Sequence, residues 1–75
     1  MSDRKQEGVL VYNYESDRYD IRFSLTDYYG GLHCGQCFDV KIKNNWFPVR
    51  IEMGEDWYLV GFEMIDDLQG LSVRI

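Results

Sequence analysis

The sequence has very little histidine, cysteine or proline: one histidine, two cysteines and one proline in 75 residues. A structural zinc site normally takes four ligands, so a carboxylate, a water or a second subunit would have to complete any site made by His33 and the cysteines. The sequence also shows no activated serine, no paired carboxylates and no phosphate-binding glycine loop. Because catalysis needs several such groups held in a pocket, we predict that the protein is not an enzyme.

Long apolar runs and clusters of basic residues are missing as well. No run is apolar enough to span a membrane, and the polar start of the chain does not resemble a signal peptide, so we expect a cytoplasmic protein without membrane contact. The net charge is −5, and the excess of acid falls in residues 51–75. Nucleic-acid binding depends on clustered lysine and arginine, and we therefore do not expect direct binding of nucleic acid. The acidic excess serves either solubility or contact with a basic partner.

The length allows one domain, and the aromatic content is high for so short a chain. Tyrosine, phenylalanine and tryptophan make up 16% of the residues, which gives a small core the bulk that it needs. Residues 1–7 are polar and charged, and we predict that they form a flexible N-terminal tail. Residues 8–75 then form a single small domain.

Four stretches, residues 19–24, 38–43, 46–53 and 71–75, alternate apolar and polar residues with a period of two. This period is typical of strands with one buried and one exposed face. The apolar run at residues 8–13 and the segment 57–61 are two further predicted strands. We expect an all-β fold, a small antiparallel barrel of five or six strands, because closure removes exposed edges. The predicted core residues are Tyr19, Ile21, Phe23, Phe38, Val40, Ile42, Val49, Ile51, Leu59 and Val73.

Two loops have recognisable turn residues. Asn44 and Asn45 suit the two central positions of a tight hairpin turn, because asparagine tolerates positive φ better than other non-glycine residues. Gly30 and Gly31 permit a sharp reversal in the long irregular segment 25–36. Pro48 lacks an N–H group and is expected at a sheet edge or a bulge.

Three motifs stand out: Leu32-His33-Cys34-Gly35, Arg50-Ile51-Glu52 and Trp57-Tyr58-Leu59-Val60-Gly61. With them, residues 7–75 resemble a family of small bacterial proteins of unknown function, found in Gram-positive bacteria and often on mobile elements. It implies a compact β-barrel of the SH3-like kind. It implies no activity and no site residues, because a shared fold does not transfer a function.

The segment His33-Cys34-Gly35-Gln36-Cys37 is one candidate site. Two cysteines separated by two residues can form a disulfide or bind a metal as thiolates, with His33 as a third ligand. The simpler interpretation is that Cys37 packs in the core beside Phe38 while Cys34 lies in the loop. We expect no cofactor.

Exposed aromatic residues are the other candidate site. The alternation places Trp46 and Arg50 on the outward face of their strand, and one of Trp57 and Tyr58 must also face outward. Tryptophan, tyrosine and arginine dominate protein interfaces, so a surface of this kind favours binding to another protein. Alternatively, Trp46 covers one end of the core. The candidate interaction surface comprises Trp46, Arg50, Tyr58, Tyr28 and Tyr29.

Three functional hypotheses follow from these patterns. The first is a non-catalytic interaction module, of a bacterial mobile element or its host, whose partner is another protein. The second is a metal- or redox-responsive protein that uses His33, Cys34 and Cys37. The third is an acidic accessory protein that targets a nucleic-acid-binding protein through that protein's basic surface. The sequence specifies neither the partner nor the oligomeric state.

Overall fold

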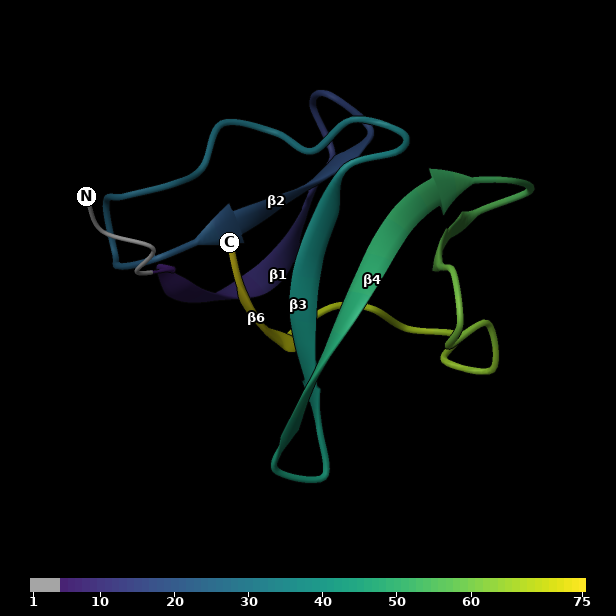
Figure 1. The fold of residues 1–75 in the computed structure, drawn as a ribbon. Coiled ribbons are helices and arrows are strands. Elements are labelled where there is room, and N and C mark those ends of the chain that lie inside the picture. The colour runs from purple at the N-terminus through teal and green to yellow at the C-terminus, as the bar shows by residue number, and fades with distance from the viewer. Residues whose placement is uncertain (1–4) are drawn as a thin grey trace.

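The computed structural model describes residues 5–75, and these form six antiparallel strands of one bent sheet without any helix (Figure 1). The strand order across the sheet is β2-β1-β6-β3-β4-β5. The all-β prediction is therefore confirmed, and no helix in the described part of the chain has the length and apolarity to cross a membrane. The strands are β1 (Glu7–Asn13), β2 (Arg18–Arg22), β3 (Cys37–Ile42), β4 (Asn45–Met53), β5 (Trp57–Leu59) and β6 (Ser72–Arg74).

The predicted closure of the sheet into a barrel is wrong. Strands β2 and β5 lie at the two ends of the strand order, and in residues 5–75 they do not pair with each other. A side chain spans this opening instead, because the Trp57 indole Nε1 donates a hydrogen bond of 3.0 Å to the main-chain oxygen of Asp17. Strand β5 is only three residues long, and such a short edge needs little further protection from unwanted pairing.

The edge of β2 is covered by the loop that follows it. Tyr28 forms a β-bridge with Arg22, and the amides of Tyr29 and Leu32 donate to main-chain oxygens of β2, each at 2.8 Å. Between these contacts the loop bulges away at the glycine pair, whose φ angles are 114° and 103°. The Asp20 carboxylate reaches out and accepts hydrogen bonds of 2.9 Å from both glycine amides. The predicted positive φ at Gly30 and Gly31 is confirmed, and the loop serves as an irregular additional strand.

The hairpin between β3 and β4 turns one residue earlier than predicted. Lys43 and Asn44 are its central residues, with φ of 50° and 68°, and Ile42 pairs with Asn45. Both φ values lie in the left-handed region that a two-residue hairpin turn needs. The prediction that Asn44 and Asn45 occupy these positions is therefore wrong by one residue. The hairpin itself and the inward direction of Phe38, Val40 and Val49 are as predicted.

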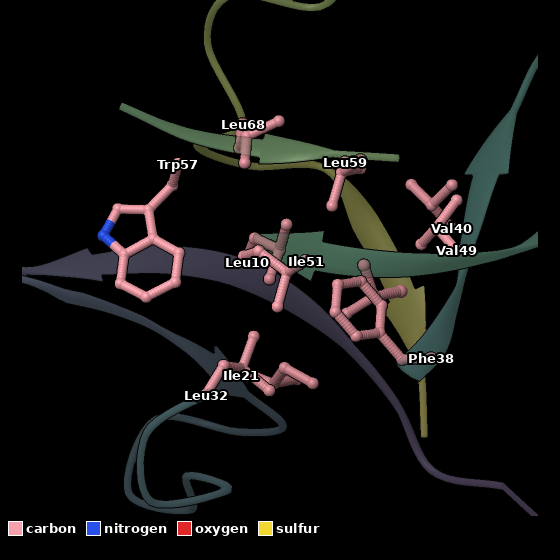
Figure 2. Close-up of a cluster of buried hydrophobic side chains, with 11 residues drawn as sticks. Leu10, Ile21, Leu32, Phe38, Val40, Val49, Ile51, Trp57, Leu59 and Leu68 are labelled. Atoms are coloured by element: carbon pink, nitrogen blue, oxygen red, sulfur yellow. The ribbon is translucent and has the colours of Figure 1, made fainter. Parts of the chain in front are cut away.

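The core lies against the concave face of the sheet (Figure 2). Seven of the ten predicted core residues are buried, while Tyr19, Phe23 and Ile42 are half-buried and pack against the cluster. Leucines from the loops complete the core, because the open side of the sheet must be covered by chain that is not in strands. The buried residues are Leu10, Ile21, Leu32, Phe38, Val40, Val49, Ile51, Trp57, Leu59, Leu68 and Val73.

The structured domain begins before Gly8, the predicted boundary. Glu7 is the first residue of β1, and Gln6 exchanges two backbone hydrogen bonds with Ile75, of 2.8 and 2.9 Å. Gln6 and Glu7, placed in the predicted tail, thus have backbone partners in Ile75 and Arg74. The rest of that tail, residues 1–4, lies outside the described residues.

Candidate functional site

The convex face of the sheet contains part of the predicted interaction surface. Trp46 and Arg50 lie on the outward side of β4, and Tyr58 lies opposite Glu52 on β5. Trp57, the neighbour of Tyr58, is 8% exposed and points into the core (Figure 2), so Tyr58 is the outward residue of this pair. Arg50 forms an ion pair of 2.8 Å with Glu52, and since its side chain is half exposed, this contact contributes little to stability.

Trp46 is covered by cations of the protein itself. The guanidinium carbon of Arg74 lies 4.4 Å from the centre of the Trp46 ring, and the Lys41 ammonium lies at 5.7 Å. Arg74 Nε is also 2.8 Å from Asp39 Oδ2, and Lys5 Nζ reaches the same oxygen at 2.8 Å. We refer to Lys5, Asp39, Arg74 and Trp46 as the outer ion cluster.

The carboxylate is the centre of the outer ion cluster. Asp39 lies in the middle of the sheet, where its partner across the β3–β6 ladder is Arg74. Hydrogen bonds from Lys5 and then from Arg74 lower the pKa of the Asp39 carboxyl below its usual 3.8, and burial opposes them with a smaller effect. Asp39 thus has two cations of the same chain beside it, and both are held by its Oδ2 atom.

Tyr28 and Tyr29 are placed apart from the rest of the predicted surface. They lie on the loop beside β2, at the opposite end of the strand order from β5. The Tyr29 hydroxyl accepts a hydrogen bond of 2.6 Å from the Gln36 side chain, which ties it to the following turn. These contacts therefore do not join the two loop tyrosines to Trp46 on β4.

The cysteine segment forms a tight turn on the surface. Gln36 N donates to His33 O at 3.1 Å, and Gly35 takes a φ of 86° in this turn. Cys34 and Cys37 are both free thiols and both exposed, so the interpretation of Cys37 as a core residue is wrong. Cys37 is the first residue of β3 and its side chain leaves the convex face, opposite to that of Phe38. Among residues 5–75, no three histidine, cysteine or acidic side chains are grouped to hold a metal ion.

A recess of about 430 Å³ opens at the end of the β1–β2 hairpin, and sequence reasoning did not identify it. Tyr12 and Tyr19 are partners across the hairpin, and Tyr14 follows on the same side of the chain. The ring of Tyr12 lies 4.9 Å from that of Tyr14 and 5.1 Å from that of Tyr19, centre to centre, at interplanar angles of 75° and 72°. We call this the tyrosine recess; its lining residues are Tyr12, Tyr14, Tyr19, Asp56, Asp67 and Gln69.

The rings of the tyrosine recess are held by contacts from three parts of the chain. The Tyr12 hydroxyl donates to Asp17 Oδ1 at 3.1 Å, and the Tyr12 amide donates to Gln69 Oε1 at 2.9 Å. Asp17 in turn accepts the Trp57 indole hydrogen bond through its main-chain oxygen. The recess is thus connected directly to the core, whereas Tyr14 is 85% exposed and free of such ties.

Two of the tyrosines that line the tyrosine recess have raised pKa values. Burial is the largest cause that raises the pKa of Tyr12 above its usual 10.0, followed by its hydrogen bond to Asp17 and the charges of Asp17 and Asp56. Burial and then the charge of Asp67 raise the pKa of Tyr19, against a backbone hydrogen bond at Leu68 that lowers it. Burial first and the nearby carboxylates second thus favour the neutral form of both hydroxyl groups.

The acids around the tyrosine recess have no ionic partners within residues 5–75. The ion pairs in this part of the chain are Lys5–Asp39, Arg74–Asp39 and Arg50–Glu52, all on the convex face. The excess of acid in residues 51–75 was visible in the sequence, and so were two tyrosines two residues apart, Tyr12 in β1 and Tyr14 just after it. The sequence did not show that the acids and the tyrosines lie close together, because this depends on how the loop after β5 returns to the β1–β2 hairpin. The carboxylates concerned are Asp56 and Asp67, which line the recess, and Asp17, which accepts the Tyr12 hydroxyl hydrogen bond.

Comparison with known proteins shows the class to which this fold belongs. The model of a family described as a domain of unknown function (DUF5348) matches residues 8–75, and the chain therefore belongs to this family. The resemblance to a family of small proteins of unknown function is thereby confirmed. A crystal structure of a protein from Ruminococcus gnavus is similar, with 64% sequence identity and a TM-score of 0.86 over 92% of this chain and 99% of that one. No curated protein matches the chain.

Proposed function

We propose that this protein is a non-catalytic module that binds a basic segment of another protein through the tyrosine recess and the carboxylates around it. The observation that supports this proposal is the separation of charge. The basic residues with ionic partners lie on the convex face, while the acids near Tyr12 and Tyr19 have no such partner in residues 5–75. Clustered charge of one sign beside aromatic rings favours a partner of opposite charge.

The proposal moves the contact away from Trp46. Arg74 already covers the Trp46 ring, so a partner would have to displace a guanidinium that Asp39 also holds. Arg50 and Tyr58 are half exposed and remain available on the same face as a second contact region. Tyr28 and Tyr29 would contribute only to a partner that also reaches the loop beside β2.

The absence of catalysis is part of the proposal and rests on the chemistry of the described groups. The one histidine, His33, lies on the surface turn and is not among the residues that line the recess. General acid–base catalysis needs a donor and an acceptor of protons directed at one reacting centre. Tyr12 and Tyr19 have raised pKa values and stay protonated at neutral pH, so they serve as neutral aromatic walls.

A partner of this chemistry also fits the third hypothesis. A basic segment that binds nucleic acid would find in the acidic recess a competing surface, so an accessory protein of this kind could occupy such a segment. We further propose that the protein acts in the cytoplasm and belongs to a bacterial mobile element or its host. In this proposal the small bent sheet is a rigid support for a peptide-binding surface, as in SH3-like domains.

The metal- or redox-responsive function is kept as a second candidate because Cys34, in the surface turn, and Cys37, at the start of β3, are both exposed thiols. Metal analysis of protein purified without a tag distinguishes the two candidates. About one zinc ion per chain that is lost in a Cys34→Ser, Cys37→Ala variant would favour the second candidate. Metal-free protein that keeps its fold under reducing conditions would favour the first.

The main test combines partner capture with matched variants. Capture from host extract by the wild type is compared with Asp56→Asn plus Asp67→Asn, and with Arg50→Ala plus Tyr58→Ala on the other face. We expect the first pair to abolish capture and the second to leave it, and capture should weaken as salt is added. Loss of capture only in the Arg50, Tyr58 pair, with the fold unchanged by circular dichroism, would overturn the assignment to the recess.

A further inference from the structure

The tyrosine recess has the composition of the outer ion cluster without its cation. In the outer ion cluster the Arg74 guanidinium lies 4.4 Å from the centre of an aromatic ring and 2.8 Å from a carboxylate. The recess also combines aromatic rings with two carboxylates, Asp56 and Asp67, but no lysine or arginine among residues 5–75 forms an ion pair with them. The outer ion cluster thus shows that a guanidinium group can bind between an aromatic ring and a carboxylate on this protein.

We propose that the tyrosine recess is a subsite for one arginine side chain of the basic segment, with the guanidinium against the tyrosine rings and its N–H groups directed to Asp56 and Asp67. This inference rests on the proposed function, because it names the anchor of the partner. It assigns a chemical class of ligand to a place that the sequence did not single out.

Arginine fits the recess better than lysine for two reasons. The guanidinium is planar and weakly hydrated, so it stacks on an aromatic face while its edge donates to a carboxylate. An ammonium group is compact and strongly hydrated, and it loses more hydration when rings surround it. The ring of Tyr12 makes edge-to-face contacts with those of Tyr14 and Tyr19, and the Tyr14 side chain is 85% exposed, so its ring offers a face to a flat cation from solvent.

The two tryptophans allow a local measurement of binding. The Trp57 indole N–H is bonded to Asp17, whose carboxylate holds Tyr12, so its NMR signal reports on the recess. The Trp46 indole lies on the convex face under Arg74 and serves as the reference in the same spectrum. The probe is a blocked Gly-Arg-Gly peptide, compared with Gly-citrulline-Gly, Gly-Lys-Gly and tetramethylammonium.

We expect the arginine peptide to shift the Trp57 signal and leave the Trp46 signal, with affinity at least about tenfold above citrulline and about threefold above lysine. Tyr14→Ala should weaken binding of the arginine peptide at least about threefold, while Tyr14→Phe should retain it, because the ring and not the hydroxyl makes the contact. Tyr14 is 85% exposed, so neither change should affect the fold.

Other outcomes would overturn the arginine subsite in distinguishable ways. Equal affinity for arginine and citrulline would remove the role of the charge, and tighter binding of tetramethylammonium would assign the recess to quaternary ammonium groups. Equal affinity for the arginine and lysine peptides, unaffected by Tyr14→Ala, would show that the carboxylates attract any cation and that the tyrosine rings make no specific contact. In that last case partner capture would still depend on Asp56 and Asp67, so the subsite would fail while the proposed function stood.

Discussion

The outer ion cluster and the tyrosine recess are built from the same kinds of group but differ in what completes them. In the cluster, Asp39 is a nearly buried carboxylate with two cations of the same chain at 2.8 Å. In the recess, the carboxylates of Asp56 and Asp67 have no ionic partner within residues 5–75. The comparison teaches that a tryptophan on the outward face of a strand need not be open to a partner, because the protein itself can supply the cation that covers it.

The largest effect is expected at the centre of the outer ion cluster. Asp39→Asn keeps the shape of the side chain but removes the charge that Lys5 and Arg74 contact. Charge-assisted hydrogen bonds in partly buried places contribute about 1.5–3 kcal/mol, so the free energy of unfolding should fall by about that amount. Urea denaturation measures this change, and a loss below about 0.5 kcal/mol would contradict the view that the cluster stabilises the fold.

The two regions should also respond to opposite ends of the pH scale. The pKa of Asp39 is lowered in the folded protein, so its stabilisation is present above the usual value of 3.8 and is lost as the pH falls through the lower folded value. The pKa values of Tyr12 and Tyr19 are raised, so their contribution is present below 10.0 and is lost as the pH rises through the folded values. Urea midpoints recorded across pH should show Asp39→Asn converging with the wild type only on the acid side.

A smaller effect is expected at Trp46. Its ring packs against Arg74 and Lys41, and a cation–π contact at a half-exposed site contributes about 0.5–1 kcal/mol. Trp46→Ala should therefore lower stability by about 1 kcal/mol and leave partner capture by the folded fraction unchanged. Thermal unfolding and partner capture, measured on the same preparation, distinguish a role of Trp46 in stability from a role in binding. Unchanged stability with lost capture would make Trp46 a binding residue and reverse the comparison.

The smallest effect is expected in the recess. Asp56→Asn together with Asp67→Asn removes two charges that have no ionic partners among residues 5–75, so stability should change by less than about 0.5 kcal/mol. Any change should be a gain, since repulsion among like charges is relieved, and it should be larger at low salt. Melting temperatures at two salt concentrations test this. A clear loss of stability would show that these acids are structural.

Much of the fold could be predicted from alternation, but the register of the central hairpin could not. Pairing Phe38 with Val49 or with Ile51 differs by two residues, and both registers leave the same side chains in the core. The structure selects the first register, which places Lys43 rather than Asn45 at a position of positive φ. Alternation therefore identifies the faces of strands, while their register depends on contacts elsewhere.

Contacts between distant segments limited the prediction of the site. Trp46 was correctly placed on the outward face, but its cover comes from Arg74, which is adjacent only because β6 lies beside β3. Similarly, Tyr12 meets Gln69 only because the loop before β6 returns to the hairpin. Sequence patterns report the environment of neighbouring residues, and both regions are made by residues far apart in the chain.

The central position of β6 has a consequence for the rate of folding. The hairpins β1–β2 and β3–β4 are local and can form early, but they do not pair with each other and are joined through β6. Val73 supplies the junction, because its partners are Gly8 on one side and Val40 on the other. Closing such distant contacts is slow compared with forming a hairpin. The docking of three residues, Ser72–Arg74, is therefore expected to limit the rate at which the two halves become one cooperative unit.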